Sequence, residues 1–124
     1  MGEILTITLP FPAAAIHSHN KGHWKRKASP IKAARATAHA EAIRLGFAGR
    51  GITKARVDYD VFYPDLRHRD LKNTTGSSCK PYLDGLVEAG VLVGDHWQVV
   101  GDSEDHADLD RDNPRVVIKI TPLA

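Results

Sequence analysis

The stretch that most constrains the fold is residues 55–64, ARVDYDVFYP, in which two kinds of side chain alternate. Apolar or aromatic side chains occupy every second position from Val57 to Tyr63, and charged side chains such as Asp58 and Asp60 lie between them. Because successive side chains of a strand point to opposite faces, this pattern is typical of a strand with one covered face. The stretch therefore predicts a half-buried strand, which ends at its closing proline.

Five further segments are assigned from periodicity and end signals: a strand over residues 3–12, a helix over 29–46, a helix over 80–90, a short strand over 91–95 and a closing strand over 114–120. Ser29 is a suitable N-cap for the first helix, Pro30 suits its first turn, and Gly46 is a suitable stop. Alanines along one side of this helix allow close approach to a sheet or to another helix. In the second helix, Pro81 is tolerated in the first turn and Gly90 is the stop.

The order of these elements predicts an α+β fold, with a small mixed or antiparallel sheet packed against two main helices. The chain has 124 residues and 42% hydrophobic residues, which is enough for one domain with a modest core. We therefore expect residues 1–124 to form a single domain.

Cysteine content and hydropathy limit the cellular setting. The single cysteine allows no intramolecular disulfide and no cysteine-rich zinc site. The sequence contains neither a signal-type apolar stretch nor a long apolar run, so we expect a soluble, intracellular protein with no membrane partner.

Charge is spread unevenly along a chain whose formal net charge is +2. Six acids and one base lie between Asp102 and Asp112, which leaves the rest of the chain basic. A basic body is compatible with a polyanionic partner, although many basic domains bind none. Residues 108–113, DLDRDN, resemble the start of a calcium loop but lack its glycine and its closing glutamate, so we interpret them as a solvated acidic loop.

A dense group of cations lies in residues 17–27, HSHNKGHWKRK, which have no apolar period and are interpreted as a loop. Two interpretations remain open: an arm that contacts phosphates while its tryptophan stacks on a base, or a solvated basic loop with a tryptophan anchor. The residues concerned are Lys21, Trp24, Lys25, Arg26 and Lys27.

The motif RHRDLKN, residues 67–73, places one acid, Asp70, among basic side chains directly after a predicted strand. A surface ion-pair cluster is the simplest explanation. The alternative is a metal-binding carboxylate that acts with Lys80, Asp84 and Asp95 further along the chain. Oxygen ligands suit Mg²⁺, which takes one or two protein carboxylates and fills its other positions with water and phosphate. A nearby lysine could stabilise charge on a phosphoryl group under attack.

These residues also carry a resemblance. RDLKN, followed by KPYLDGLVEAGVLVGD and preceded by ITLPFP, resembles the RusA family of Holliday-junction resolvases of phages and bacteria. The resemblance covers nearly the whole chain and is strongest from Arg69 to Val100. It implies a small α+β homodimer, encoded by a phage or prophage and acting in the bacterial cytoplasm. Such a dimer binds four-way DNA junctions and nicks opposing strands with Mg²⁺, without a small-molecule cofactor.

Residue by residue, the resemblance implies that Asp70 and Asp95 bind the metal, with Asp84 as a further ligand, and that Lys80 is the catalytic lysine. Cations near the site are then expected to bind the DNA backbone. They are the residues of the basic arm named above together with Arg67, Arg69 and Lys72.

The sequence departs from the family pattern in three places. Lys72 replaces a second aspartate, Gly94 replaces the first member of an aspartate pair, and TTGSS lengthens the connection to Lys80, which we interpret as an added loop. An ammonium beside the metal weakens cation binding. An active nuclease is the leading hypothesis. The alternatives are a catalytically impaired junction-binding protein and a basic protein with another partner, such as RNA.

Overall fold

The computed structural model describes residues 3–16 and 24–123. Its elements, in chain order, are β1 (Leu5–Pro10), η1 (Ala14–Ile16), α1 (Trp24–Arg44), β2 (Ala55–Tyr63), α2 (Leu71–Asn73), η2 (Thr74–Ser78), α3 (Lys80–Glu88), β3 (Asp105–Leu109) and β4 (Arg115–Pro122). Among the described residues, no helix is both long and apolar enough to cross a membrane.

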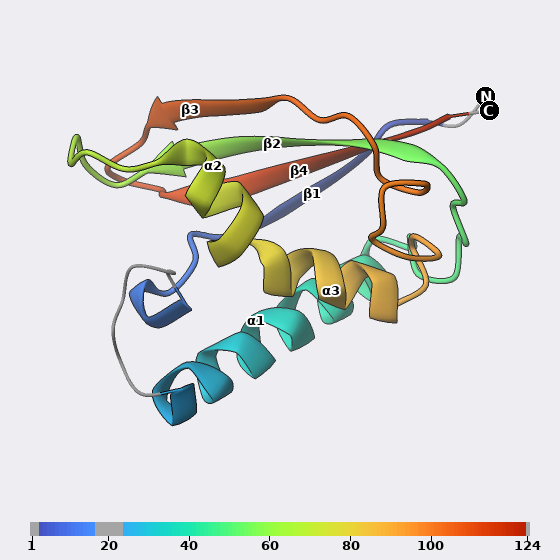
Figure 1. The fold of residues 1–124 in the computed structure, drawn as a ribbon, viewed down its shortest axis with the longest axis horizontal. Coiled ribbons are helices and arrows are strands. Elements are labelled where there is room, and N and C mark those ends of the chain that lie inside the picture. Colours follow the sequence, from blue (N-terminus) through green and yellow to red (C-terminus); the bar gives the residue numbers. More distant parts are fainter. Residues whose placement is uncertain (1–2, 17–23, 124) are drawn as a thin grey trace.

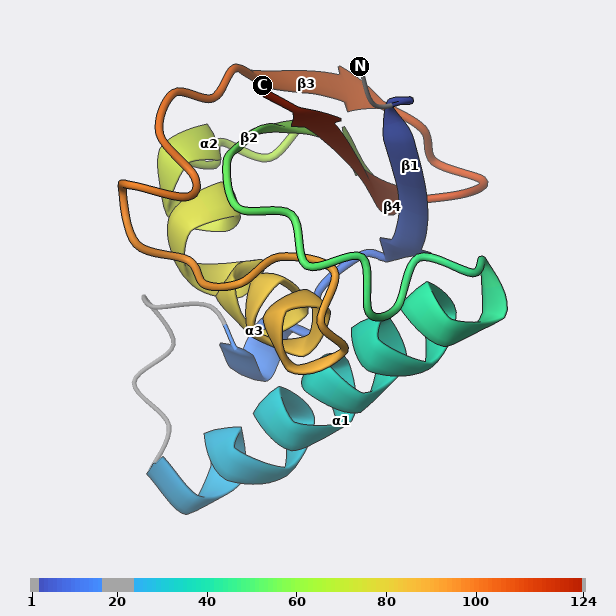
Figure 2. The ribbon, with the colours of Figure 1, turned by 90° about the vertical axis from the view of Figure 1, so that its right-hand side faces the viewer.

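The four strands form one mixed sheet in the order β1-β4-β2-β3. β4 runs antiparallel to both β1 and β2, and β3 runs parallel to β2. α1 and α3 lie together on one side of this sheet, as Figure 1 and Figure 2 show from two directions. The α+β prediction is therefore confirmed, with a mixed rather than an antiparallel sheet and two main helices.

The strand predicted from alternation is β2, and its inner face is buried as expected. Side chains on this face, from Val57 to Tyr63, pack with those of β4 at Val116, Ile118 and Ile120. Charged side chains of β2 point to the other face of the sheet, where the Lys119 ammonium lies 3.0 Å from an Asp60 carboxylate oxygen. The alternating pattern thus separates an apolar inner face from an ion-paired outer face.

The alanine stripe of α1 packs against another helix, α3. Ala34, Ala38 and Ala42 are buried, and Gly85 of α3 lies directly against this part of α1. A Cβ built on Gly85 would lie 2.3 Å from the Arg35 carbonyl oxygen and 3.0 Å from the Ala38 Cβ. Small residues on both helices therefore allow the backbones to approach closely, and this contact fixes the position of α3.

The start predicted for the first helix is wrong. α1 begins at Trp24, so Ser29 is not its N-cap and Pro30 lies inside the helix. An internal proline removes one backbone donor and crowds the preceding turn. The alanine-rich sequence after it favours the helix strongly enough to continue through this position. The part of the predicted basic loop from Trp24 to Lys27 consequently belongs to α1.

Of two predictions near the carboxyl terminus, the first is wrong and the second is correct only in part. Residues 91–95 form no strand; Leu92 makes a single bridge to Ile52 instead. Of the predicted acidic loop, residues 108 and 109 belong to β3 (Asp105–Leu109), which pairs with β2, whereas residues 110–113 do form a loop. Acids next to β3 are paired rather than merely solvated: Glu104 with Arg56 and Asp110 with Arg115. The pairing of β3 with β2 and the Glu104–Arg56 ion pair join residues far apart in the sequence, and the local pattern of charges could not show them.

Candidate active site

Lys80, Asp84 and Asp95 form one charged cluster, which we call the Lys80 cluster. Lys80 is the first residue of α3, Asp84 lies one turn later, and Asp95 lies in the loop that follows the helix. The Lys80 ammonium donates hydrogen bonds to Asp84 Oδ1 and, over 2.5 Å, to Asp95 Oδ2. The spacing of four residues predicted that Lys80 and Asp84 share a helix face, and this is confirmed.

The protonation of the cluster follows from these contacts. Partial burial acts against the charge on Lys80, but hydrogen bonds to the two carboxylates outweigh it and raise the pKa of the ammonium. The hydrogen bond and charge of Lys80 lower the pKa of Asp95. The lysine and this aspartate therefore both stay charged throughout the neutral range.

Removing the lysine should reverse this effect on Asp95. The ordinary value for this carboxyl is 3.8, and we expect its NMR titration midpoint to lie below that value in the wild type and to move upward in Lys80→Met. Because folding lowers the pKa of Asp95, its pairing with Lys80 stabilises the folded protein at pH values above the ordinary pKa of 3.8. This contribution is lost as the pH falls through the lowered titration midpoint of Asp95. An identical Asp95 midpoint in the two proteins would contradict this assignment.

Asp70 lies outside the Lys80 cluster and caps α2. Its Oδ1 atom accepts hydrogen bonds from the backbone N–H groups of Lys72 and Asn73 at 3.0 and 3.3 Å. This is the usual role of an aspartate at an N-cap. Its Oδ2 atom receives no hydrogen bond from the described residues, and the side chain is exposed. The structure therefore does not bring Asp70 together with Asp84 and Asp95, but it leaves one carboxylate oxygen open.

The segment between Asp70 and Lys80 is helical, so the prediction of an added loop there is wrong. Thr74–Ser78 form the π-helical turn η2, which joins α2 to α3. The Tyr63 and Thr74 hydroxyls share a 2.8 Å hydrogen bond that anchors this turn to the end of β2. Wide turns of this kind accommodate extra residues within a helical path. Here η2 places Asp70 and Lys80 at opposite ends of that path.

Asp105, on β3, is a candidate site residue that sequence reasoning missed. Its Oδ2 atom accepts a 2.7 Å hydrogen bond from the Thr75 hydroxyl, whereas its Oδ1 atom is buried without a hydrogen-bond partner in the described part of the chain. Asp105 lines a cavity of about 200 Å³ together with Lys80, Tyr59 and Thr75. Burial of the Cys79 thiol, and then the negative charge of Asp105, raise the pKa of that thiol to about 12.

The reason for missing Asp105 is its sequence context. It stands among other acids, and only the parallel pairing of Tyr59 with Asp105 brings it beside η2 and α3. No short-range motif connects residue 105 with residue 75 or 80. The one usable signal is the acid itself, at the start of a segment that could extend a sheet.

The predicted DNA-binding cations fall into three groups. Arg67 and Lys72 are exposed, and Lys72 makes no ion pair with the described residues. Arg69 is only 16% exposed; it lies 2.6 Å from an Asp65 carboxylate oxygen and over the Tyr63 ring, so it already holds the loop after β2. The third group lies outside the description: Lys21 entirely, and Trp24, Lys25, Arg26 and Lys27 as regards their side chains.

The fit of Mg²⁺ can be judged from the oxygen donors. Among residues 3–16 and 24–123, no group of three or more His, Cys, Asp or Glu side chains is arranged to hold a metal ion. Mg²⁺ needs only one or two protein carboxylates, however. Asp84 and Asp95 already converge on one cation, the Lys80 ammonium. Asp105 adds a buried carboxylate oxygen, Oδ1, that has no hydrogen-bond partner among the described residues. The donor set therefore fits Mg²⁺ in chemical type.

Comparison with known proteins adds one relative. A protein from Xylella fastidiosa (strain Temecula1 / ATCC 700964), described only as "Uncharacterized protein", is 30% identical to this chain over 89 residues. The match covers 70% of this chain and 58% of that protein, so the chain spans little more than half of the relative's length. No protein-family model matches the chain.

Proposed function

We propose that this protein is a Mg²⁺-dependent, structure-specific endodeoxyribonuclease that nicks four-way or other branched DNA in phage recombination or replication. The observation that carries the proposal is the Lys80 cluster: one ammonium held between the carboxylates of Asp84 and Asp95. The cluster combines oxygen donors for a hard cation with a positive group for a phosphate. The resemblance of RDLKN and LDGLVEAG to the resolvase pattern supports the choice of DNA junctions as substrate.

The residues of the Lys80 cluster that would hold Mg²⁺ are Asp95 and Asp84. The resemblance adds Asp70, which lies outside this cluster in the structure, and Asp105 is a further acid that lines a cavity with Lys80. Asp95 stands first because both its position in the Lys80 cluster and the family resemblance support it. When bound, Mg²⁺ supplies charge neutralisation at the phosphate and lowers the pKa of a coordinated water. Asp84 and Asp95 orient the Lys80 ammonium, which can then donate to a non-bridging oxygen of the scissile phosphate and stabilise its developing charge.

The surrounding cations would hold the DNA backbone. Lys72 is exposed and makes no ion pair with the described residues, so its ammonium is available for phosphate; Arg67 is also exposed, although its guanidinium lies 3.3 Å from an Asp65 carboxylate oxygen. Such contacts position the nucleic acid without reading its sequence, and they weaken with added salt. A homodimer would place two copies of the site on one junction, which is what nicking of opposing strands requires.

Substrate preference and metal dependence test the proposal together. We expect the protein to bind a synthetic four-way junction more tightly than a linear duplex of the same arm sequence at moderate salt. We expect nicks in the junction with MgCl₂ and none with EDTA. Equal affinity for the two DNAs would contradict structure-specific recognition, and a protein that stays monomeric on the junction would contradict paired nicking.

Asp70→Asn separates the capping role of this residue from metal binding. Asparagine caps helices about as well as aspartate, so we expect the free energy of unfolding to change by less than about 0.5 kcal/mol. We expect nicking to fall at least tenfold, because the open oxygen Oδ2 of a carboxylate is replaced by a much poorer metal ligand. Urea unfolding and a nicking assay measure the two effects. Full activity in Asp70→Asn would leave Asp84 and Asp95 as the proposed ligands.

A second candidate function is a catalytically impaired junction-binding protein, and Lys72 is the observation that favours it. The residue puts an exposed ammonium where the resemblance leads one to expect a second acid, two positions after Asp70. Tight junction binding without any Mg²⁺-dependent nicking in the wild type would establish this alternative. Tighter binding to RNA than to branched DNA would instead favour the third hypothesis, a basic protein with another partner.

A further inference from the structure

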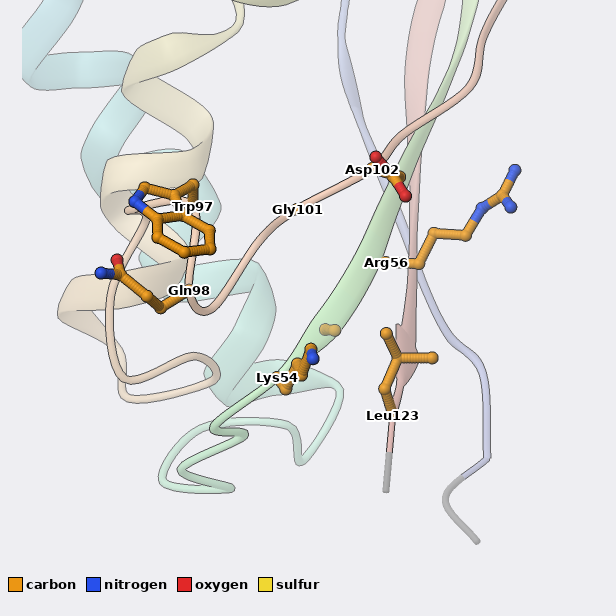
Figure 3. Close-up of a pocket in the computed structure, with 8 residues that line it drawn as sticks. Lys54, Arg56, Trp97, Gln98, Gly101, Asp102 and Leu123 are labelled. Atoms are coloured by element: carbon orange, nitrogen blue, oxygen red, sulfur yellow. The ribbon is translucent and has the colours of Figure 1, made fainter.

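A groove of about 630 Å³ lies beside the loop that carries Asp95, and none of the roles above uses it. Trp97 and Gln98 line it from the loop, whereas Lys54, Arg56 and Leu123 line it from the ends of β2 and β4 (Figure 3). Its volume lies within the range of roughly 300–1,000 Å³ that is typical of small-ligand sites. The groove therefore has room for a nucleobase with part of its sugar.

Trp97 is the most exposed large hydrophobic side chain in the described part of the chain, at 77%. The backbone that carries it is nevertheless fixed: the Val99 N–H donates to the His96 carbonyl at 2.9 Å, and the Ala55 N–H donates to the Val99 carbonyl at 2.8 Å. The Val99 side chain is buried. An exposed indole on an anchored turn is a ready surface for stacking, because the backbone that carries it needs no reordering on binding.

Polar groups around the indole fit a nucleotide better than an apolar peptide. Lys54 makes no ion pair with the described residues, so its ammonium is available for a phosphate. Arg56 is already paired with Asp58 and Glu104. The Gln98 carbonyl oxygen lies 2.7 Å from a His96 ring nitrogen, which leaves its amide N–H₂ for the edge of a base. Asp102 adds one acid to the lining and limits its net positive charge.

We propose that this groove binds one unpaired nucleobase of the DNA substrate, stacked on Trp97, with Lys54 at an adjacent phosphate. The inference rests on the proposed function, because it names a further contact for the same substrate. Asp95 precedes Trp97 by two residues and pairs with Lys80. A base that stacks on Trp97 would therefore keep the adjacent sugar-phosphate backbone of the DNA close to the Lys80 cluster. Trp97 is thus a specificity residue for DNA whose branch point offers an unpaired base.

The test is equilibrium binding in EDTA, where no nicking occurs, to two four-way junctions that differ by one unpaired 2-aminopurine at the branch point. We expect Trp97→Ala to weaken binding to the junction with the unpaired base about tenfold, and Trp97→Phe to keep affinity within about threefold of the wild type. The wild type should quench the 2-aminopurine fluorescence and Trp97→Ala should not. Ile43→Ala, which removes another exposed apolar side chain, should match the wild type.

Three results overturn the inference. Unchanged affinity and unchanged quenching in Trp97→Ala, with a wild type that binds both junctions, would reject the base-stacking groove and leave the proposed nuclease standing. A wild type that binds neither junction would reject both the proposed function and the groove. An equal loss of affinity for the two junctions in Trp97→Ala would also reject the groove, because it would show no dependence on the unpaired base.

Discussion

Asp95→Asn is expected to lower Mg²⁺-dependent nicking of a four-way junction about 100-fold or more while junction binding in EDTA is kept. The substitution preserves the size of the side chain and removes its charge. Two contributions would be lost together: the proposed carboxylate ligand for Mg²⁺, and the negative charge that pairs with the Lys80 ammonium at 2.5 Å. Loss of one preorganised electrostatic group commonly costs about 10²–10³ in rate, which sets the expected size of the effect.

A matched control for this substitution is Asp112→Asn, which makes the same chemical change at an exposed acid in the turn before β4. We expect this variant to nick and to bind like the wild type. Single-turnover assays on a labelled junction measure both proteins under one set of conditions. Equal rates for Asp95→Asn and Asp112→Asn would remove Asp95 from the site.

Gly85→Ala is expected to lower the free energy of unfolding by about 2 kcal/mol, although alanine is the better helix former. The added methyl would lie 2.3 Å from the Arg35 carbonyl oxygen, which belongs to the backbone of α1 and cannot rotate away. Overpacking of this kind costs about 1–3 kcal/mol, and any backbone shift adds to it. The gain in helix propensity, about 1 kcal/mol, offsets only part of this cost.

Gly76→Ala is the matched control for this prediction, because no atom of the described residues lies within 4 Å of the Cβ it would carry and its backbone needs no positive φ. We expect it to leave stability unchanged or slightly raised. Because α3 carries Lys80 and Asp84, we also expect Gly85→Ala to reduce nicking. Equal unfolding free energies for Gly85→Ala and the wild type in urea would contradict the close contact between α1 and α3.

Local patterns predicted the parts of the molecule that depend on local physics. The alternation from Val57 to Tyr63 identified β2, because burial of one face leaves a period of two in the sequence. The stops at Gly46 and Gly90 were predicted correctly, and both residues adopt positive φ after their helices. The four-residue spacing of Lys80 and Asp84 predicted one of the two ion pairs of the Lys80 cluster.

The remaining features depend on contacts between distant residues. Asp105 reaches η2 only because β3 pairs parallel with β2, and a lone acid in an acidic segment gives no sign of that pairing. The TTGSS insertion was assigned to a loop because it lengthens the connection relative to the resolvase pattern, yet these residues form a π-helical turn in which Thr74, Thr75 and Ser78 are buried. Asp70 was predicted to act with Asp84 and Asp95. In the structure η2 lies between Asp70 and α3, and Asp70 lies outside the Lys80 cluster.

The most direct test of the central claim is single-turnover nicking of a four-way junction by the wild-type protein, with each strand labelled in turn. The claim is that the Lys80 cluster belongs to a Mg²⁺-dependent junction nuclease. We predict nicks in two opposing strands, close to the branch point, with MgCl₂ and none with EDTA. Intact strands under both conditions, with the junction fully bound, would contradict the claim and leave a protein that binds junctions without cutting them.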